Sequence, residues 1–125
     1  MYRPYYRSEK TFAAGRLKRG EMNNTEKAYD RYLQELLATG KILWYRFEGI
    51  KFRLAKDLSY LPDFAVMLPD GQIEIHEVKG AMRIFQDDAK AKIKMAAAMF
   101  PFRFLVVIPR PKKYGGGWEV REIDV

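Results

Sequence analysis

A Pro-Asp-Gly turn at positions 69–71 separates two expected strands, 61–68 and 72–79, and constrains the fold more than any other feature of the sequence. Proline suits the first position of a three-residue hairpin loop, aspartate the second, and glycine the left-handed third position. A loop of this length pairs Leu68 with Gln72, and each further pair then lies one residue outward on both strands. The sequence therefore predicts a tight β-hairpin with a defined register.

This register places two acids, Asp63 and Glu77, directly opposite each other. Directly opposed residues have Cβ atoms about 4.5–5.5 Å apart, and like charges at that separation destabilise a sheet. Lys79 lies two residues beyond Glu77 and therefore on the same face. One interpretation is that a bound cation compensates the two carboxylates. The other is a solvated cross-strand cluster in which Lys79 neutralises Glu77.

The first interpretation predicts a particular chemistry. Mg²⁺ prefers carboxylate oxygens completed by water and substrate phosphate. Such a metal polarises the phosphate and lowers the pKa of a bound water, while a nearby ammonium stabilises charge that develops on phosphorus. Asp63, Glu77 and Lys79 are therefore candidates for a metal-dependent phosphodiester hydrolase site, with Mg²⁺ as the expected cofactor and Mn²⁺ as its substitute.

The charge distribution supports a partner of the same kind. The net charge is +7, from 23 lysines and arginines against 16 aspartates and glutamates, which favours a polyanion such as nucleic acid. Residues 61–78 are the exception, because they contain four carboxylates and no lysine or arginine. A protein that only binds nucleic acid gains nothing from such a segment. A nuclease needs basic side chains to bind the phosphates of its substrate and carboxylates to bind a metal ion. A solvated acidic hairpin is the alternative.

Several classes of protein are excluded by what the sequence lacks. It has no cysteine, which excludes disulfide frameworks, thiolate zinc sites and cysteine nucleophiles. The single histidine, His76, leaves no histidine relay, and strand alternation places it on the face opposite Glu77. No apolar run approaches the ~18 residues of a membrane span. We therefore expect an intracellular protein without membrane contact.

The remaining pattern predicts an α/β or α+β fold with a single mixed β-sheet flanked by helices, in the order α-β-β-β-α-β and with a last edge strand. Residues 1–22 are expected to form a basic, aromatic N-terminal arm, and residues 23–125 the folded domain. The elements expected besides the hairpin are a helix from 23–25 to Gly40, a strand within 42–54, a helix over 86–99, a strand over 102–109 and an edge strand over 118–125.

Basic residues outside the hairpin gather in the N-terminal arm, on the second helix and in the loop after Pro109. We expect them to contact phosphates and not to read bases. The residues expected to bind DNA are Arg3, Arg7, Lys18, Arg19, Lys92, Lys94, Arg110, Lys112 and Lys113.

The hairpin sequence YLPDFAVMLPDGQIEIHEVKG also resembles a known signature. Thirteen residues separate Asp63 of its PDF motif from Glu77 of its EVKG motif. Together with the expected elements over residues 23–109, this run resembles the PD-(D/E)XK nucleases, and it is similar to the corresponding stretch of the phage-type endonuclease I family of Holliday-junction resolvases. The resemblance implies a restriction-endonuclease-like core, Asp63 and Glu77 as metal ligands, the Val78 carbonyl as a further ligand, and Lys79 as the catalytic lysine.

The same resemblance implies two more site residues. The family uses a glutamate on its first helix, and Glu26 occupies that place on the inward side of the expected helix, as a catalytic residue and metal ligand. The alternative is a capping box, in which Glu26 only satisfies the helix N-terminus together with Asn23. Many members also place a polar residue on the second helix. Of Gln86, Lys90 and Lys92 we favour Lys90.

These residues predict a Mg²⁺-dependent DNA endonuclease that selects branched DNA, similar to a junction resolvase. The resemblance implies a phage or prophage protein in the bacterial cytoplasm. It also implies a homodimer, because a four-way junction presents two symmetric strands. Two alternatives stay open: another phage DNA-processing nuclease that nicks or trims ends, and a non-cleaving DNA-binding protein on a nuclease scaffold.

Overall fold

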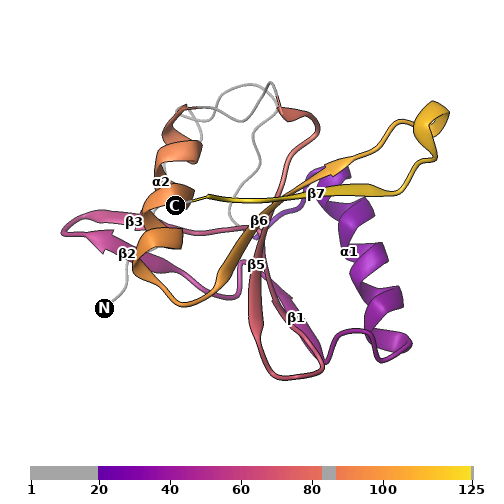
Figure 1. Cartoon of the computed structure of the whole chain (residues 1–125), viewed down its shortest axis with the longest axis horizontal. Helices are drawn as coiled ribbons and strands as arrows, with labels where there is room; N and C mark the ends of the chain where they lie inside the picture. The colour runs from indigo at the N-terminus through magenta and orange to yellow at the C-terminus, as the bar shows by residue number, and fades with distance from the viewer. Residues whose placement is uncertain (1–19, 83–86, 125) are drawn as a thin grey trace.

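The structure of the chain is a computed structural model that describes residues 20–82 and 87–124 (Figure 1). Most of the expected N-terminal arm lies outside these residues, as does Gln86. The elements within them are α1 (Asn24–Ala38), β1 (Trp44–Phe47), β2 (Phe52–Ala55), β3 (Leu58–Tyr60), β4 (Phe64–Met67), β5 (Ile73–Val78), α2 (Asp87–Met99), β6 (Arg103–Pro109), a 3-10 helix (Lys112–Tyr114) and β7 (Trp118–Glu122).

Five strands form one mixed sheet in the spatial order β1-β4-β5-β6-β7. Strands β5 and β6 are parallel neighbours joined through α2, whereas all other neighbours in this sheet are antiparallel. Strands β2 and β3 form a separate antiparallel pair. The expected α+β class, with a mixed sheet and flanking helices, is confirmed. The strand expected within 42–54 is divided between β1 of the large sheet and β2 of the small one.

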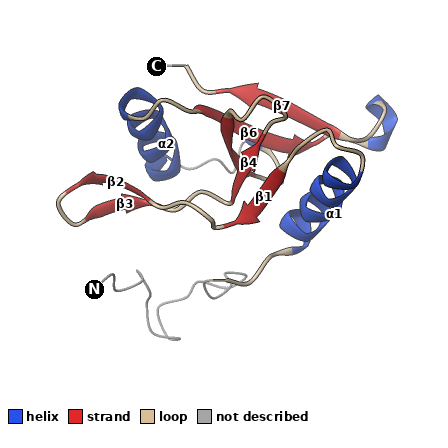
Figure 2. Cartoon of the chain, turned by 90° about the horizontal axis from the view of Figure 1, so that it is seen from below, coloured by secondary structure: helices blue, strands red, loops and turns tan. Residues whose placement is uncertain are grey.

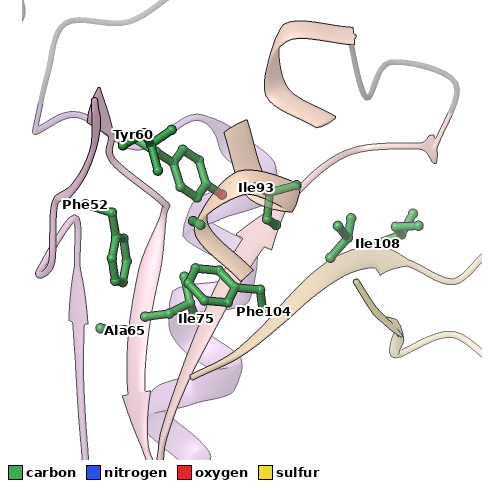
Figure 3. Close-up of a cluster of buried hydrophobic side chains, with 10 residues drawn as sticks. Phe52, Tyr60, Ala65, Ile75, Ile93, Phe104 and Ile108 are labelled. Atoms are coloured by element: carbon green, nitrogen blue, oxygen red, sulfur yellow. The ribbon is translucent and has the colours of Figure 1, made fainter. Parts of the chain in front are cut away.

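The two helices cover opposite faces of the large sheet, as Figure 2 shows. On one face, Tyr29 and Leu33 of α1 are buried against Phe64 of β4. On the other face, Ile93 of α2 is buried against Ile75 of β5 and against the β2–β3 hairpin. Figure 3 shows this second core, with Phe52, Tyr60, Ala65, Ile75, Ile93, Phe104 and Ile108 labelled.

Alternation along β5 decides which polar side chain meets which helix. Ile75 belongs to the core under α2, so Glu77, two residues further, lies on the same face. His76 points to the α1 face, where its ring contacts the ring of Tyr29. None of the helices in the described part of the chain is both long and apolar enough to span a membrane.

Candidate active site

The β4–β5 hairpin has the register that the turn predicts. Phe64 pairs with His76, and the Leu68 N–H donates a hydrogen bond of 2.8 Å to the Gln72 carbonyl. Gly71 has a φ of +89°, the left-handed conformation that glycine adopts at little cost. The predicted three-residue turn is therefore confirmed.

Asp63 lies just beyond the paired part of β4, one step outward from Phe64 and therefore opposite Glu77. Its Oδ2 accepts a hydrogen bond of 2.8 Å from the Val78 backbone N–H, which holds the carboxylate against β5. Its main-chain carbonyl accepts a hydrogen bond of 2.6 Å from the Glu48 N–H. The side chain of Asp63 is thus held by β5, and its main chain by the residue that follows β1, so the carboxylate has a defined position.

Neighbouring acids affect the ionisation of Asp63. The pKa of Asp63 is raised well above its usual range, first by burial, then by the negative charges of Glu77 and Glu26, and also by a hydrogen bond with the Glu26 side chain. The Val78 N–H opposes this shift only in part, because its hydrogen bond favours the ionised form. The carboxyls of Glu26 on α1 and Glu77 on β5 therefore both act on Asp63, just before β4, and we call these three residues the acid cluster.

Glu77 is the most enclosed of the three, with only 7% of its surface exposed. The Tyr60 hydroxyl donates a hydrogen bond of 2.7 Å to Oε1, and the Lys79 ammonium lies 3.3 Å from Oε2. Burial raises the pKa of Glu77, while Lys79 and the Tyr60 hydrogen bond act in the opposite direction. The predicted contact between Lys79 and Glu77 is confirmed.

The sequence left two roles open for Glu26, one as a site residue and one in a capping box, and the structure is compatible with both. It is the third residue of α1, where its Oε1 accepts a hydrogen bond of 2.9 Å from the Asn23 N–H, while its own N–H donates one of 2.8 Å to Asn23 Oδ1. The capping box is therefore present. The Glu26 side chain also acts on Asp63, because it is among the groups that raise the pKa of that carboxyl. The capping geometry holds the glutamate at the acid cluster, so the two interpretations are compatible.

The donor set suits a hard divalent cation, although it is small. No group of three or more His, Cys, Asp or Glu side chains within residues 20–82 and 87–124 is arranged so that it could hold a metal ion. Mg²⁺ commonly uses only one or two carboxylates and takes its other ligands from water and substrate phosphate. The facing pair Asp63 and Glu77 provides that number, so the residues present fit the predicted ion.

The structure places His76 away from these acids, as strand alternation predicts. Its Nδ1 lies 2.7 Å from the Tyr29 hydroxyl and its Nε2 lies 3.0 Å from Glu74 Oε1. Glu74 Oε2 accepts a hydrogen bond of 2.8 Å from Arg103 Nη1. We call these four residues, Tyr29, Glu74, His76 and Arg103, the α1-face cluster. Each member has an opposite charge or a hydrogen-bond partner, which explains the buried histidine without a ligand.

The other predicted site residues are spread over the molecule. Lys90 is exposed on α2, followed by the partly buried Lys92 and the exposed Lys94. The basic residues after β6 are all exposed on the loop that leads to β7. The four basic residues expected in the arm, Arg3, Arg7, Lys18 and Arg19, lie outside the described residues. The roles of Lys90 and of the basic residues stay predictions.

Tyr60 is the site residue that the sequence did not indicate. It ends β3, which belongs to the small sheet, and its hydroxyl reaches across to Glu77 on the large one. One signal was present: a buried tyrosine needs a hydrogen-bond partner, and Tyr60 lies three residues before Asp63. Finding the partner required knowing that β2 and β3 fold over the sheet.

Comparisons of the chain with protein-family models, with curated proteins and with solved structures find no match.

Proposed function

We propose that the chain is a Mg²⁺-dependent DNA endonuclease of the PD-(D/E)XK type, which selects branched DNA. The observation that carries this proposal is the position of Asp63 opposite Glu77, with the Lys79 ammonium 3.3 Å from Glu77 Oε2. Like charges facing each other across a sheet cost stability. A function that requires two oxygen ligands and an ammonium in one place explains why the chain carries them together.

Each residue has a role that its surroundings favour. Asp63 and Glu77 would hold the ion, with the Val78 carbonyl as a further ligand, and Glu26 would orient Asp63 or bind a second ion. When bound, the metal would supply an activated water and a polarised phosphate. Lys79 would stabilise charge on the scissile phosphate, since its ammonium is already fixed beside Glu77. Tyr60 would keep the Glu77 carboxylate ionised and correctly rotated.

The proposal extends to partners and location. The net positive charge and the exposed basic side chains on α2 and after β6 favour DNA as the substrate. A homodimer belongs to the proposal because it would cut both symmetric strands of a junction. The bacterial cytoplasm, during phage DNA processing, is where such a substrate would be met. Sedimentation of the protein with and without junction DNA tests the oligomeric state.

Cleavage assays test the proposed function directly. Four-way junction, fork and linear duplex DNA are incubated with the protein in Mg²⁺, in Mn²⁺ or in EDTA. We expect metal-dependent cutting that is fastest on the junction. Asp63→Asn and Lys79→Ala are each expected to slow cutting by about a thousandfold, since each removes a ligand or a positive charge from the transition state.

Glu74→Gln is the matched control for these variants. Glu74 is also a buried carboxylate of β5, but it lies on the opposite face, against α1. Its replacement is expected to leave the cleavage rate of the folded protein within about twofold, in line with ordinary surface and structural changes outside a site. DNA binding without cutting of any substrate would favour the non-cleaving alternative. Preferential cutting of ends or linear duplex would favour another processing nuclease.

A further inference from the structure

The loop between β6 and β7 carries an exposed aromatic ring among basic side chains. Tyr114 is 67% exposed, the largest fraction among the exposed large hydrophobic side chains of the described residues. Arg110, Lys112 and Lys113 lie in the same segment, which contains no acid between Pro109 and Trp118. Surfaces that bind single-stranded nucleic acid combine aromatic rings, on which bases stack, with basic side chains that neutralise the phosphates. This loop contains both.

The loop has a defined conformation that presents this ring. Its ends are closed by a hydrogen bond of 2.9 Å from the Arg110 N–H to the Gly117 carbonyl. Within it, the Tyr114 and Gly116 N–H groups both donate to the Pro111 carbonyl, at 2.9 and 3.1 Å. Three consecutive glycines, 115–117, have φ values of 104°, 67° and 73°, in the region that only glycine adopts at little cost. The sequence therefore specifies a shape that keeps Tyr114 outside the core.

The loop also lies at the edge of the sheet that holds the acid cluster. Strands β5 and β6 are parallel, so their carboxyl ends meet at one edge, with Val78 beside Val107. The Lys79 N–H donates a hydrogen bond of 2.9 Å to the Val107 carbonyl, and Arg110 follows three residues later. Figure 1 shows the loop extending from this edge, beyond the rest of the sheet. DNA bound at the acid cluster would thus lie at the same edge of the sheet as the loop.

We propose that Tyr114 stacks on an unpaired or unstacked base at the branch point of the DNA, and that this contact provides part of the selectivity for branched substrates. This inference rests on the proposed function, since it assigns a second contact to the same substrate. The Lys113 ammonium lies 5.1 Å from the centre of the Tyr114 ring. Because this ammonium lies over one face of the ring, a base would stack on the other face, and the charge of Lys113 favours a nucleotide over an uncharged partner.

Binding in EDTA tests the inference independently of cleavage. Affinities of the full chain are measured by fluorescence anisotropy for a four-way junction, a fork with single-stranded arms, and a linear duplex. Stacking on an aromatic side chain contributes about 1–3 kcal/mol per base. Tyr114→Ala is therefore expected to weaken junction and fork binding about tenfold and to change duplex binding by less than twofold. Tyr114→Trp should retain the preference for branched DNA.

Lys112→Ala is the matched control, because Lys112 is an exposed lysine of the same loop. It should weaken binding of all three DNAs by a similar factor and reduce the slope of log affinity against log salt by about one, because it removes a phosphate contact. In a junction that carries 2-aminopurine at the branch point, the fluorescence should change on binding of the parent and change much less with Tyr114→Ala.

The outcomes separate this inference from the proposed function. A protein that cuts junctions but keeps its substrate preference in Tyr114→Ala would overturn the stacking contact alone. A protein that binds branched DNA through Tyr114 but never cuts it would support the contact and overturn the nuclease. Equal loss of affinity for all three DNAs in Tyr114→Ala, or a change of oligomeric state without a change in DNA preference, would also overturn the contact.

Discussion

Strand β5 carries buried polar groups on both of its faces, and the two sets are built in opposite ways. On the α1 face, Glu74 is bonded to His76 and to Arg103, and the second nitrogen of His76 is bonded to the Tyr29 hydroxyl. On the α2 face, Glu77 lies opposite another carboxylate, Asp63, which in turn contacts Glu26. One set compensates its charges within the fold, whereas the other places three carboxyls against a single ammonium, that of Lys79.

The pKa shifts of the carboxyls record this difference. The hydrogen bond to His76, and then the charges of His76 and Arg103, lower the pKa of Glu74 below its usual value against the opposing effect of burial. Burial, followed by the charges of Glu77 and Glu26, raises the pKa of Asp63. A lowered pKa means that the fold stabilises the carboxylate, and a raised pKa means that it resists the charge. Folding alone therefore explains the α1-face cluster, while Asp63 in the acid cluster keeps a repulsion that the proposed metal ion would relieve.

The largest expected difference between the two sets is in stability. His76→Ala should lower the free energy of unfolding by about 3 kcal/mol, because it leaves the buried Tyr29 hydroxyl and Glu74 Oε1 without their hydrogen-bond partner, while Arg103 still holds Glu74 Oε2. Asp63→Asn, measured in EDTA, should leave stability unchanged or raise it slightly, since it removes a repelled charge and keeps an oxygen for the Val78 N–H. Chemical denaturation measures both. A loss of several kcal/mol in Asp63→Asn would contradict the comparison.

The two sets should also respond to pH in opposite directions. Since the pKa of Glu74 is lowered, its contribution is present at neutral pH and is lost as the pH falls below the ordinary value of about 4. Since the pKa of Asp63 is raised, its protonated form favours the folded state, so stability falls as the pH rises above about 4.

These slopes are limited to about 1.4 kcal/mol per pH unit for each group. Denaturation curves between pH 3 and 7 in EDTA should therefore show a weaker acid-side decline in Glu74→Gln. They should show a weaker decline toward neutral pH in Asp63→Asn, where the raised pKa of Glu77 still contributes. If both variants alter the same side of the profile, the assignment of the two environments is wrong.

The smallest predicted effect concerns the two buried tyrosines, one on each face. Tyr60→Phe removes the hydrogen bond to Glu77 Oε1, which raises the pKa of that carboxyl and should move the acid limb of the cleavage rate to higher pH. The cost in stability should be about 1 kcal/mol. Tyr29→Phe removes the corresponding bond to His76 and should cost a similar amount without moving the pH profile. Equal pH profiles for the two variants would remove Tyr60 from the site.

Local patterns were enough to predict the hairpin and the facing acids. The turn residues determine the register, and strand alternation then separates Glu77 from His76. The β2–β3 hairpin was not predicted, because its turn at Asp57 has a φ of 60° without a glycine to indicate it. The bond from Tyr60 to Glu77 depends on how that hairpin packs over the large sheet, which is long-range information. The 3-10 helix of the β6–β7 loop was not predicted either, because a segment of three residues is too short to show a helical periodicity.

The most direct test of the central claim is the change in unfolding temperature that Mn²⁺ produces in the parent and in Asp63→Asn. An ion that binds only the folded protein stabilises it by about 2.7 kcal/mol at a concentration of one hundred times its Kd. The account predicts a clear rise of several degrees in the parent, which vanishes in Asp63→Asn, while Glu74→Gln keeps it. A parent protein that Mn²⁺ leaves unchanged, or equal stabilisation of the parent and Asp63→Asn, would contradict the claim that the facing acids are a metal site.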